Sequence, residues 1–119
     1  MGISFLGAES KAFSNEHLYL FCKPWADSGF TAQQTAQQIS CVAYVAGVLD
    51  ITDYLCELGN LTNNSSLKGM TTFEAKSQVN AVVQSYVNTM AARPERWKYA
   101  AAPSLQAVAV NLAPCISSN

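Results

Sequence analysis

Apolar residues recur at intervals of three and four along most of this chain, and this spacing constrains the fold more than any other feature of the sequence. One such stripe consists of Ile39, Cys41, Val45, Val48, Thr52 and Leu55, with Tyr44 and Leu49 beside it. A later stripe consists of Val79, Val82, Val83, Tyr86, Val87 and Met90. Because an α-helix completes a turn in about 3.6 residues, each stripe occupies one helical face. The sequence shows no sustained two-residue alternation, so the pattern predicts an all-α fold.

Start and stop signals divide the first half of the chain into a short helix and a long one. Ser14 is a suitable N-cap for a helix over Glu16–Cys22, and Pro24 is expected to end it. Thr31 and Gln34 then form a T-x-x-Q capping box, which predicts the start of the long helix.

We expect the long helix to end near Leu58, because a polar run follows. Residues 60–69 read NLTNNSSLKG, and Asn, Ser and Gly favour turns. This segment is predicted to be a surface loop. A hydrophilic loop on a rigid helical scaffold is well placed to enter a partner's cleft, although a passive connector has the same composition.

The second half of the chain predicts two more helices. Thr71 and Glu74 make another capping box, and Pro94 ends the helix that follows. The last helix is expected over Tyr99–Leu112, with Pro103 in its first turn or at a kink.

Length and composition exclude several classes of protein. The chain has 119 residues, of which 50% are hydrophobic and 13% charged, with a net charge of -1. These values predict one domain, residues 13–119, preceded by an N-terminal extension or expression remnant over residues 1–12. Since ordinary domains carry about 25% charged residues, the low charge argues against a disordered chain and against a nucleic-acid partner. No run approaches about 18 consecutive apolar residues, so we expect no membrane partner.

Four cysteines, Cys22, Cys41, Cys56 and Cys115, bear on the cellular compartment. Their even number and the absence of a C-x-x-C pair favour two disulfides over buried free thiols or a zinc site. Among the three possible connectivities we favour Cys22–Cys41 and Cys56–Cys115. The first would link the short helix to the start of the long one, and the second would tie the C-terminal end to the middle of the chain. The expected fold is a compact bundle of about four helices held by two disulfides.

The titratable residues offer little for catalysis. His17 is the single histidine and lies five residues before Cys22, an offset that separates the two side chains around a helix. Asp50 and Asp53 are one helical turn apart, but no third acidic ligand follows at a familiar spacing. We therefore predict neither an enzyme nor a metal site, and no cofactor.

A basic cluster surrounds Trp97 just after a predicted helix end. It contains Arg93, Arg96 and Lys98. Compensation of the helix dipole together with aromatic packing explains such a cluster, and a small electropositive contact patch is the functional alternative.

The stretch C-V-A-Y-V-A-G-V-L-D, Cys41 to Asp50, resembles the C-x-G-Y-x-x-G-x-x-D signature of immunity proteins of the Rap/Tai type. These proteins neutralise peptidoglycan amidase toxins delivered by bacterial type VI secretion. Further matches follow in order: a cysteine ending the first helix, a cysteine after the signature helix, V-x-x-Y-V-x-x-x-x-x-R-P over Val83–Pro94, and A-P-C over Ala113–Cys115. The chain departs from the family in having Ala43 in place of glycine and a longer segment after the signature helix.

The resemblance implies a small helical periplasmic protein, often a homodimer, that blocks the catalytic groove of a cognate amidase. The signal peptide is absent from this chain and presumed removed. The expected inhibitory segment is the polar run after the long helix. Its partner-binding residues are Asn60, Leu61, Thr62, Asn63, Asn64, Ser65, Ser66, Leu67 and Lys68. The alternative is a secreted helical carrier, which predicts a continuous internal cavity for a small apolar ligand, whereas an inhibitor predicts a filled core.

Overall fold

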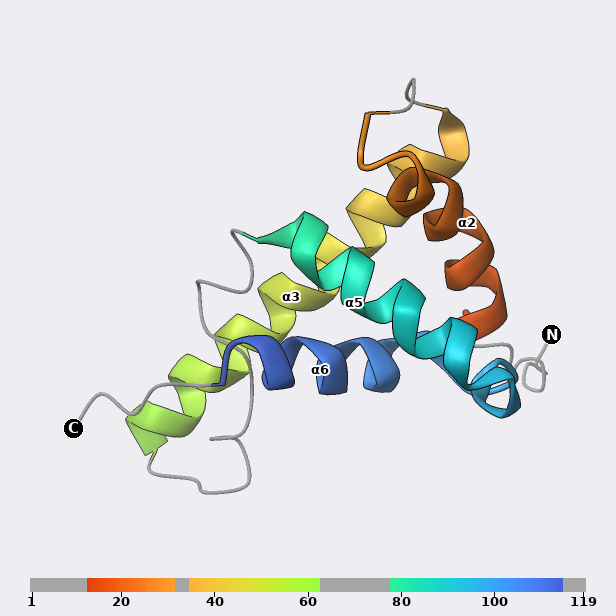
Figure 1. Cartoon of the computed structure of the whole chain (residues 1–119). Coiled ribbons are helices and arrows are strands. Elements are labelled where there is room, and N and C mark those ends of the chain that lie inside the picture. Colours follow the sequence, from red (N-terminus) through yellow and green to blue (C-terminus); the bar gives the residue numbers. More distant parts are fainter. Residues whose placement is uncertain (1–12, 32–34, 63–77, 115–119) are drawn as a thin grey trace, which may run out of the picture.

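The protein is all-α, as the periodicity predicts. The computed structural model describes residues 13–31, 35–62 and 78–114. Over these ranges it contains four α-helices and one 3₁₀ turn (Figure 1). They are α2 (Asn15–Asp27), α3 (Ala36–Thr62), α5 (Val79–Ala92), η2 (Pro94–Arg96) and α6 (Ala101–Leu112). The described ranges contain no strand, although an isolated backbone bridge joins Ser14 to Ala100.

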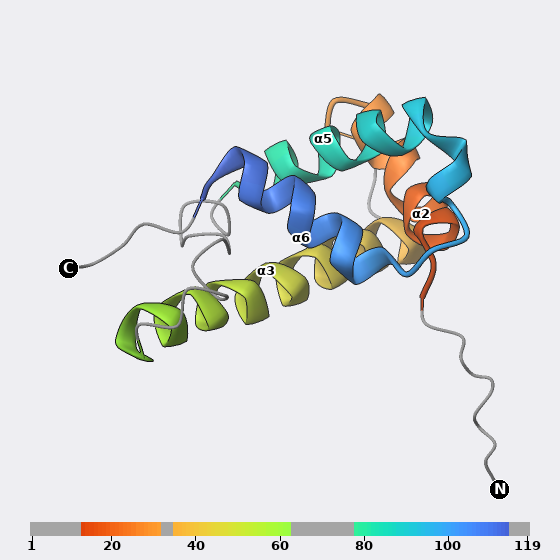
Figure 2. The ribbon, with the colours of Figure 1, turned by 90° about the horizontal axis from the view of Figure 1, so that it is seen from below.

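The core lies where the four helices meet. Helix α2 packs against α3 and α5, and α6 contacts both α3 and α5. Figures 1 and 2 show that α3 runs past the other helices at its C-terminal end. The largest fully buried apolar side chains come from all four helices and are Leu18, Val45, Leu49, Val82, Val83, Tyr86, Met90 and Leu105. They belong to one contiguous cluster, which forms the core of the bundle.

Helix α2 continues through Pro24 to Asp27, so the prediction that this proline ends the helix was wrong. A proline inside a helix removes one backbone hydrogen bond, here to the carbonyl of Leu20. Both Leu20 and Pro24 are exposed, so water can solvate that carbonyl. The turn beyond the proline is held by Ala26, which is buried in the core.

A Schellman motif ends α2. The amide of Phe30 donates to the carbonyl of Trp25 at 3.0 Å, and that of Gly29 donates to Ala26 at 3.0 Å. Gly29 has a φ of 69°, a left-handed conformation that glycine adopts without steric cost. The rings of Trp25 and Phe30 meet edge to face with centroids 5.6 Å apart. This contact closes the turn and fixes the direction in which the chain leaves the helix.

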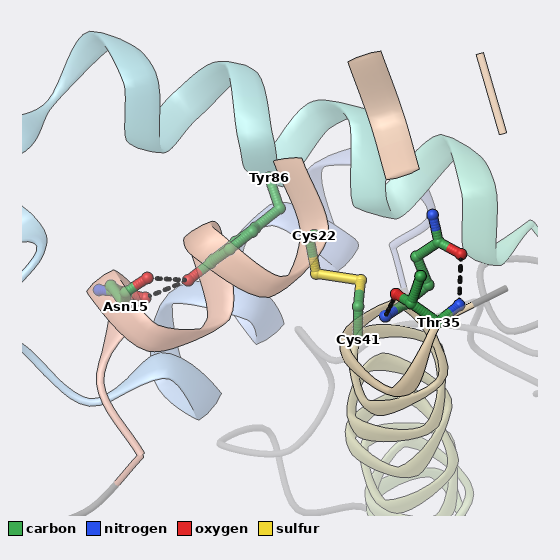
Figure 3. Close-up of a disulfide and its surroundings, with 6 residues drawn as sticks. Asn15, Cys22, Thr35, Cys41 and Tyr86 are labelled. Atoms are coloured by element: carbon green, nitrogen blue, oxygen red, sulfur yellow. Dashed lines mark hydrogen bonds between the residues drawn. A yellow bond between two sulfur atoms is a disulfide. The ribbon is translucent and has the colours of Figure 1, made fainter. Parts of the chain in front are cut away.

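Helix α3 begins four residues later than expected, because a second T-x-x-Q box forms its cap. The sequence T-A-Q-Q occurs twice, at 31–34 and at 35–38. In the structure Thr35 N–H donates to Gln38 Oε1 at 2.8 Å and Gln38 N–H donates to Thr35 Oγ1 at 3.2 Å (Figure 3). Thr31 instead belongs to the preceding turn, where its hydroxyl donates to Ser28 O at 2.7 Å. Gln34, the other member of the predicted box, lies outside the described residues, and the cap seen at the start of α3 is the repeat at Thr35 and Gln38.

The buried face of α3 differs in part from the predicted stripe. Ile39, placed inside by the sequence analysis, is 55% exposed, whereas Leu49 is fully buried. The residues of α3 that face the core are Gln38, Cys41, Val45, Leu49, Thr52 and Cys56. Ile39 lies two residues from Cys41, about 200° around the helix, so the disulfide that holds Cys41 in the core turns Ile39 outward.

A disulfide joins Cys22 of α2 to Cys41 of α3 across 19 residues, with the Cα atoms 5.2 Å apart (Figure 3). Both residues are fully buried. This predicted pair is confirmed. The other predicted pair joins Cys56 to Cys115, and Cys115 lies outside the described residues. One disulfide is therefore seen in the described part of the chain, where the sequence predicted two.

The two C-terminal helices end where the sequence predicts, although α5 begins only at Val79. Helix α5 ends at Ala92, before Pro94, and buries Val82, Val83, Tyr86, Val87 and Met90. Helix α6 contains Pro103 in its first turn, where a missing amide proton breaks no intrahelical bond. The predicted capping box at Thr71 and Glu74 lies outside the described residues.

A buried polar network ties the first residue of α2 to three other parts of the chain. Asn15 is fully buried. Its side-chain amide donates to Arg96 O at 2.9 Å and to Ser104 Oγ at 3.0 Å. The Tyr86 hydroxyl donates to Asn15 Oδ1 at 2.7 Å, as Figure 3 shows. The burial of Tyr86 raises its pKa far above the ordinary value for tyrosine, so this hydroxyl remains a hydrogen-bond donor across the physiological range.

Candidate interaction surfaces

The predicted partner-binding segment begins inside a helix. Asn60, Leu61 and Thr62 form the last turn of α3, so the prediction that the helix ends near Leu58 was wrong. Gly59 weakens a helix by about 1 kcal/mol relative to alanine, but it is buried here, and packing around it offsets this cost. The remaining candidates, 63–68, lie outside the described residues. The segment therefore starts at the end of α3 that extends past the other helices (Figure 2).

The signature segment Cys41 to Asp50 forms the middle of α3, and its residues face two directions. Cys41 is disulfide-bonded in the core. Tyr44 lies beside the core with its ring 5.0 Å from that of Phe13, and partial burial raises the pKa of Tyr44. Gly47 and Asp50 are exposed. A Cβ added at Gly47 would meet nothing within 4 Å among the described residues. Folding of this chain therefore does not require glycine at position 47.

The outer face of α3 is largely apolar, although Asp50 and Glu57 are also exposed there. Ile39, Ile51 and Tyr54 are 55%, 58% and 60% exposed. The sequence has no run of 18 apolar residues, yet by length and composition the window Ala36–Gly59 qualifies as a membrane-crossing helix, with 33% of it buried in the protein. A core helix can meet the same criteria. Here the buried part consists of residues that pack on α2, α5 and α6, and the apolar outer face is left without a partner among the described residues.

Two open grooves flank this outer face. One has a volume of about 320 Å³ and is lined by Trp25, Gln38, Ile39, Val42 and Ala43. The indole N–H of Trp25 is buried and has no acceptor in the described part of the chain. The other groove, of about 390 Å³, lies between α3 and α6 and is lined by Ala43, Tyr44, Gly47, Val48, Ile51, Ala102 and Gln106. Both grooves open at the surface.

The basic cluster noticed in the sequence forms an exposed ridge between α5 and α6. Arg96 N–H donates to Arg93 O at 3.0 Å, and Tyr99 N–H donates to Arg96 O at 3.1 Å. Each bond spans three residues, so Arg93, Arg96 and Tyr99 lie one tight turn apart in succession. The Lys98 ammonium lies 5.5 Å from the centre of the Tyr99 ring. We call Arg93, Arg96, Lys98 and Tyr99 the basic ridge.

The polypeptide beneath the ridge is firmly held. The carbonyl of Trp97 accepts the amide of Glu16 at 2.9 Å, and that of Tyr99 accepts the amide of Asn15 at 2.8 Å. The Trp97 indole donates to Met90 O at 2.7 Å, and its ring lies 5.0 Å from that of Tyr19. The expected aromatic packing of Trp97 is thus present, and it turns the tryptophan inward while the neighbouring cationic side chains remain exposed.

The candidate catalytic and metal-binding residues remain apart. The Cys22 sulfur is committed to the disulfide, so it provides no thiolate for His17. His17 Nδ1 lies 3.1 Å from Ser14 Oγ, and its ring stacks on Phe13. Asp50 and Asp53 lie on α3. No group of three or more His, Cys, Asp or Glu residues within the described ranges is arranged to hold a metal ion.

Sequence reasoning missed the apolar outer face of α3 and the alignment of the ridge. The face was hidden because the sequence shows which residues of α3 are apolar but not which of them α2, α5 and α6 cover. The ridge had a usable signal. Arg93, Arg96 and Tyr99 are spaced by three, and Pro94 between them favours a tight turn. Comparisons of the chain with protein-family models, with curated proteins and with solved structures found no match.

Proposed function

We propose that this chain is an immunity protein that binds a cognate peptidoglycan amidase of a type VI secretion system and occludes its active-site groove. The observation that carries the proposal is the position of the signature segment. It forms the centre of α3, anchored by Cys41 in the core, and the same helix ends in the polar residues expected to contact the toxin. The chain acts by binding, without making or breaking bonds in a substrate.

The end of α3 is a suitable base for an inhibitory segment. From Cys41 to Thr62 the helix extends over about 30 Å, at 1.5 Å per residue. Its C-terminal end lies away from α2 and from the loop between α5 and α6 (Figures 1 and 2). A groove-filling segment that starts there can approach an enzyme without collision from the rest of the bundle. Asn and Ser residues at 60–68 supply donors and acceptors for such a contact.

The disulfide supports a periplasmic location, since structural disulfides persist in oxidising compartments. An inhibitor of a wall-cleaving enzyme must also be present where that enzyme acts. We include a second disulfide, Cys56–Cys115, in the proposal. Cys56 is only 5% exposed and is not a free thiol.

The decisive experiment is co-purification of the tagged chain with the product of the adjacent toxin gene, followed by an assay of peptidoglycan cleavage. A variant with residues 63–68 replaced by Gly and Ser of equal length should remain helical and lose most inhibition. The matched control replaces Gln84 and Asn88, a hydrogen-bonded pair on the surface of α5, with serine and should inhibit fully. Full inhibition by the folded loop variant contradicts the assignment of the loop, and failure to bind any amidase contradicts the function.

We further propose that the apolar outer face of α3 pairs with a second copy of the chain. Small exposed residues at Ala36, Ser40, Ala43 and Gly47 let a second helix approach closely. The helix is about 40 Å long and about 10–12 Å across, so its outer face supplies about half of the roughly 800 Å² that each partner buries in a stable interface, and the flanks on α2 and α6 would supply the rest.

This pairing is tested by Ile51→Lys, which places a charge in the middle of the face. Light scattering after size exclusion should give a dimer for the wild-type chain and a monomer for the variant. The matched control is Leu20→Lys on α2, where the side chain is 51% exposed and outside this face. A monomeric wild-type chain, or equal effects of the two substitutions, contradicts the proposal.

The carrier alternative receives less support. It predicts a continuous internal cavity, and the two apolar hollows described above are open surface grooves beside α3. The core between the helices is one contiguous cluster of buried side chains. A folded chain that binds a fluorescent fatty acid with a stoichiometry of about one would favour the carrier.

A further inference from the structure

We propose that the basic ridge is a second interaction surface and that it binds a carboxylate-bearing segment of a protein partner. The ridge lies at the opposite end of the molecule from the end of α3 (Figures 1 and 2). This contact is therefore separate from the proposed inhibitory segment and does not depend on it.

The side chains of the ridge are concentrated and exposed. Three of the seven Lys and Arg residues in the chain fall within residues 93–98. The Arg93 side chain is 55% exposed and Tyr99 is 57% exposed. The successive three-residue turns bring Arg93, Arg96 and Tyr99 close together along the backbone. Two guanidinium groups and a phenol spaced in this way match an extended segment that offers acidic side chains at short intervals.

The ridge is also pre-organised, because its carbonyl groups are bound to the rest of the fold. Arg96 O accepts the buried Asn15 amide, and Trp97 O and Tyr99 O accept backbone amides of α2. The Trp97 side chain anchors the segment from below. Binding should therefore reduce the conformational entropy of surface side chains only, because the backbone of the ridge is already held in place.

The charges favour an anion with few, discrete groups. Glu95 Oε2 lies 4.0 Å from Arg93 Nη1 and offsets one positive charge, which leaves the ridge with a net charge of about +2 at neutral pH. The backbone amide of Glu16 on α2 donates to Trp97 O, and the Glu16 side chain is exposed. Its negative charge therefore limits the positive surface on the side of α2. A duplex or a bilayer presents an extended array of charge that needs more cations than this. A guanidinium instead binds a single carboxylate in bidentate fashion, and Arg and Tyr are enriched at the energetic centres of protein interfaces.

Fluorescence anisotropy tests the proposal with the full chain and a labelled ten-residue peptide of alternating Glu and Gly, at 50 mM salt. The wild-type chain should bind this peptide, and the double variant R93Q/R96Q should weaken binding about tenfold or more. The double variant R93K/R96K keeps the charge but loses bidentate geometry, so it should weaken binding about threefold. The matched control K23Q removes a cation that is paired with Asp27 on α2, and it should change affinity less than about twofold.

Two further arms separate the classes of anion. Phosphatidylglycerol vesicles and single-stranded oligo(dT) should bind more weakly than the peptide at equal charge concentration. No detectable peptide binding, an equal loss in K23Q, undiminished affinity in R93K/R96K, or tighter binding to vesicles or DNA each overturns the proposal. Since all substituted side chains lie at the surface, circular dichroism should show unchanged helicity in every variant.

Discussion

The network around Asn15 permits a strict test of how this fold is held together. The perturbation is a double-mutant cycle of Asn15→Ala and Tyr86→Phe, two residues that are fully buried and joined by the 2.7 Å bond between Tyr86 Oη and Asn15 Oδ1. Both substitutions remove polar groups without adding bulk. Their effects should therefore report hydrogen bonding and burial rather than steric strain.

The structure sets the size of each effect. Tyr86→Phe deprives Asn15 Oδ1 of its donor, which should lower the free energy of unfolding by about 1–2 kcal/mol. Asn15→Ala also removes the bonds to Arg96 O and Ser104 Oγ, so we expect a loss of about 2–4 kcal/mol. After Asn15→Ala the Tyr86 hydroxyl retains only a 3.3 Å contact with the backbone carbonyl of residue 15. The double variant no longer has this poorly satisfied hydroxyl, so it should be about 1–2 kcal/mol more stable than the sum of the single effects predicts.

Urea unfolding followed by circular dichroism measures all four stabilities. The control cycle uses Gln84→Ala and Asn88→Ala, an exposed pair joined at 3.0 Å along α5, where the coupling should be no more than about 0.5 kcal/mol. If the two buried substitutions are additive within about 0.5 kcal/mol, the network does not act as a unit and the reasoning fails.

Three other predictions concern stability. Replacing Cys22 and Cys41 together with alanine should cost about 3 kcal/mol in urea unfolding, from the entropy of closing a loop across 19 residues, and an unchanged midpoint would contradict this. Burial raises the pKa of Tyr86, so above about pH 10 the unfolded chain releases a proton that the folded chain keeps. The free energy of unfolding should therefore fall by up to about 1.4 kcal/mol per pH unit in this range. Tyr86→Phe should make this fall with pH shallower. Thr35→Ala removes the cap of α3 and should lower the free energy of unfolding by about 1 kcal/mol. Thr31→Ala should lower it by less than half of that. Equal losses would show that both T-A-Q-Q copies cap the helix.

The sequence predicted which segments are helical better than where the helices begin. Periodicity and Pro94 gave the end of α5 and its buried face. The start of α3 could not be chosen locally, since the sequence offers the same capping box twice in succession. The choice depends on the Schellman turn after α2, which uses Thr31 for its own hydrogen bonds. The Schellman motif itself forms only because α2 continues past Pro24.

Local rules failed at Pro24 and Gly59 for a related reason. Each residue disfavours a helix by a few kcal/mol or less, a cost that the packing of one neighbouring turn can offset. Tertiary contacts decide such cases, and they are not visible in a window of sequence. The candidate surfaces were only partly predictable because they too depend on tertiary contacts. The composition showed a basic cluster, but its alignment depends on carbonyl groups held by α2 from about 80 residues away.

The constraints on α2 explain why both candidate surfaces can be exposed and yet fixed. Its first residue holds the backbone beneath the basic ridge, and Cys22 near its C-terminal end holds α3. The two surfaces thus share one rigid support, although they lie at opposite ends of the molecule. Midway along α3, the Thr52 hydroxyl accepts a 2.9 Å hydrogen bond from Gln106 Nε2 of α6. Beyond Thr52, the buried residues Cys56 and Gly59 continue the packed side of α3. The same helix thus carries the signature segment in its packed part and leads into the segment that we propose enters the toxin.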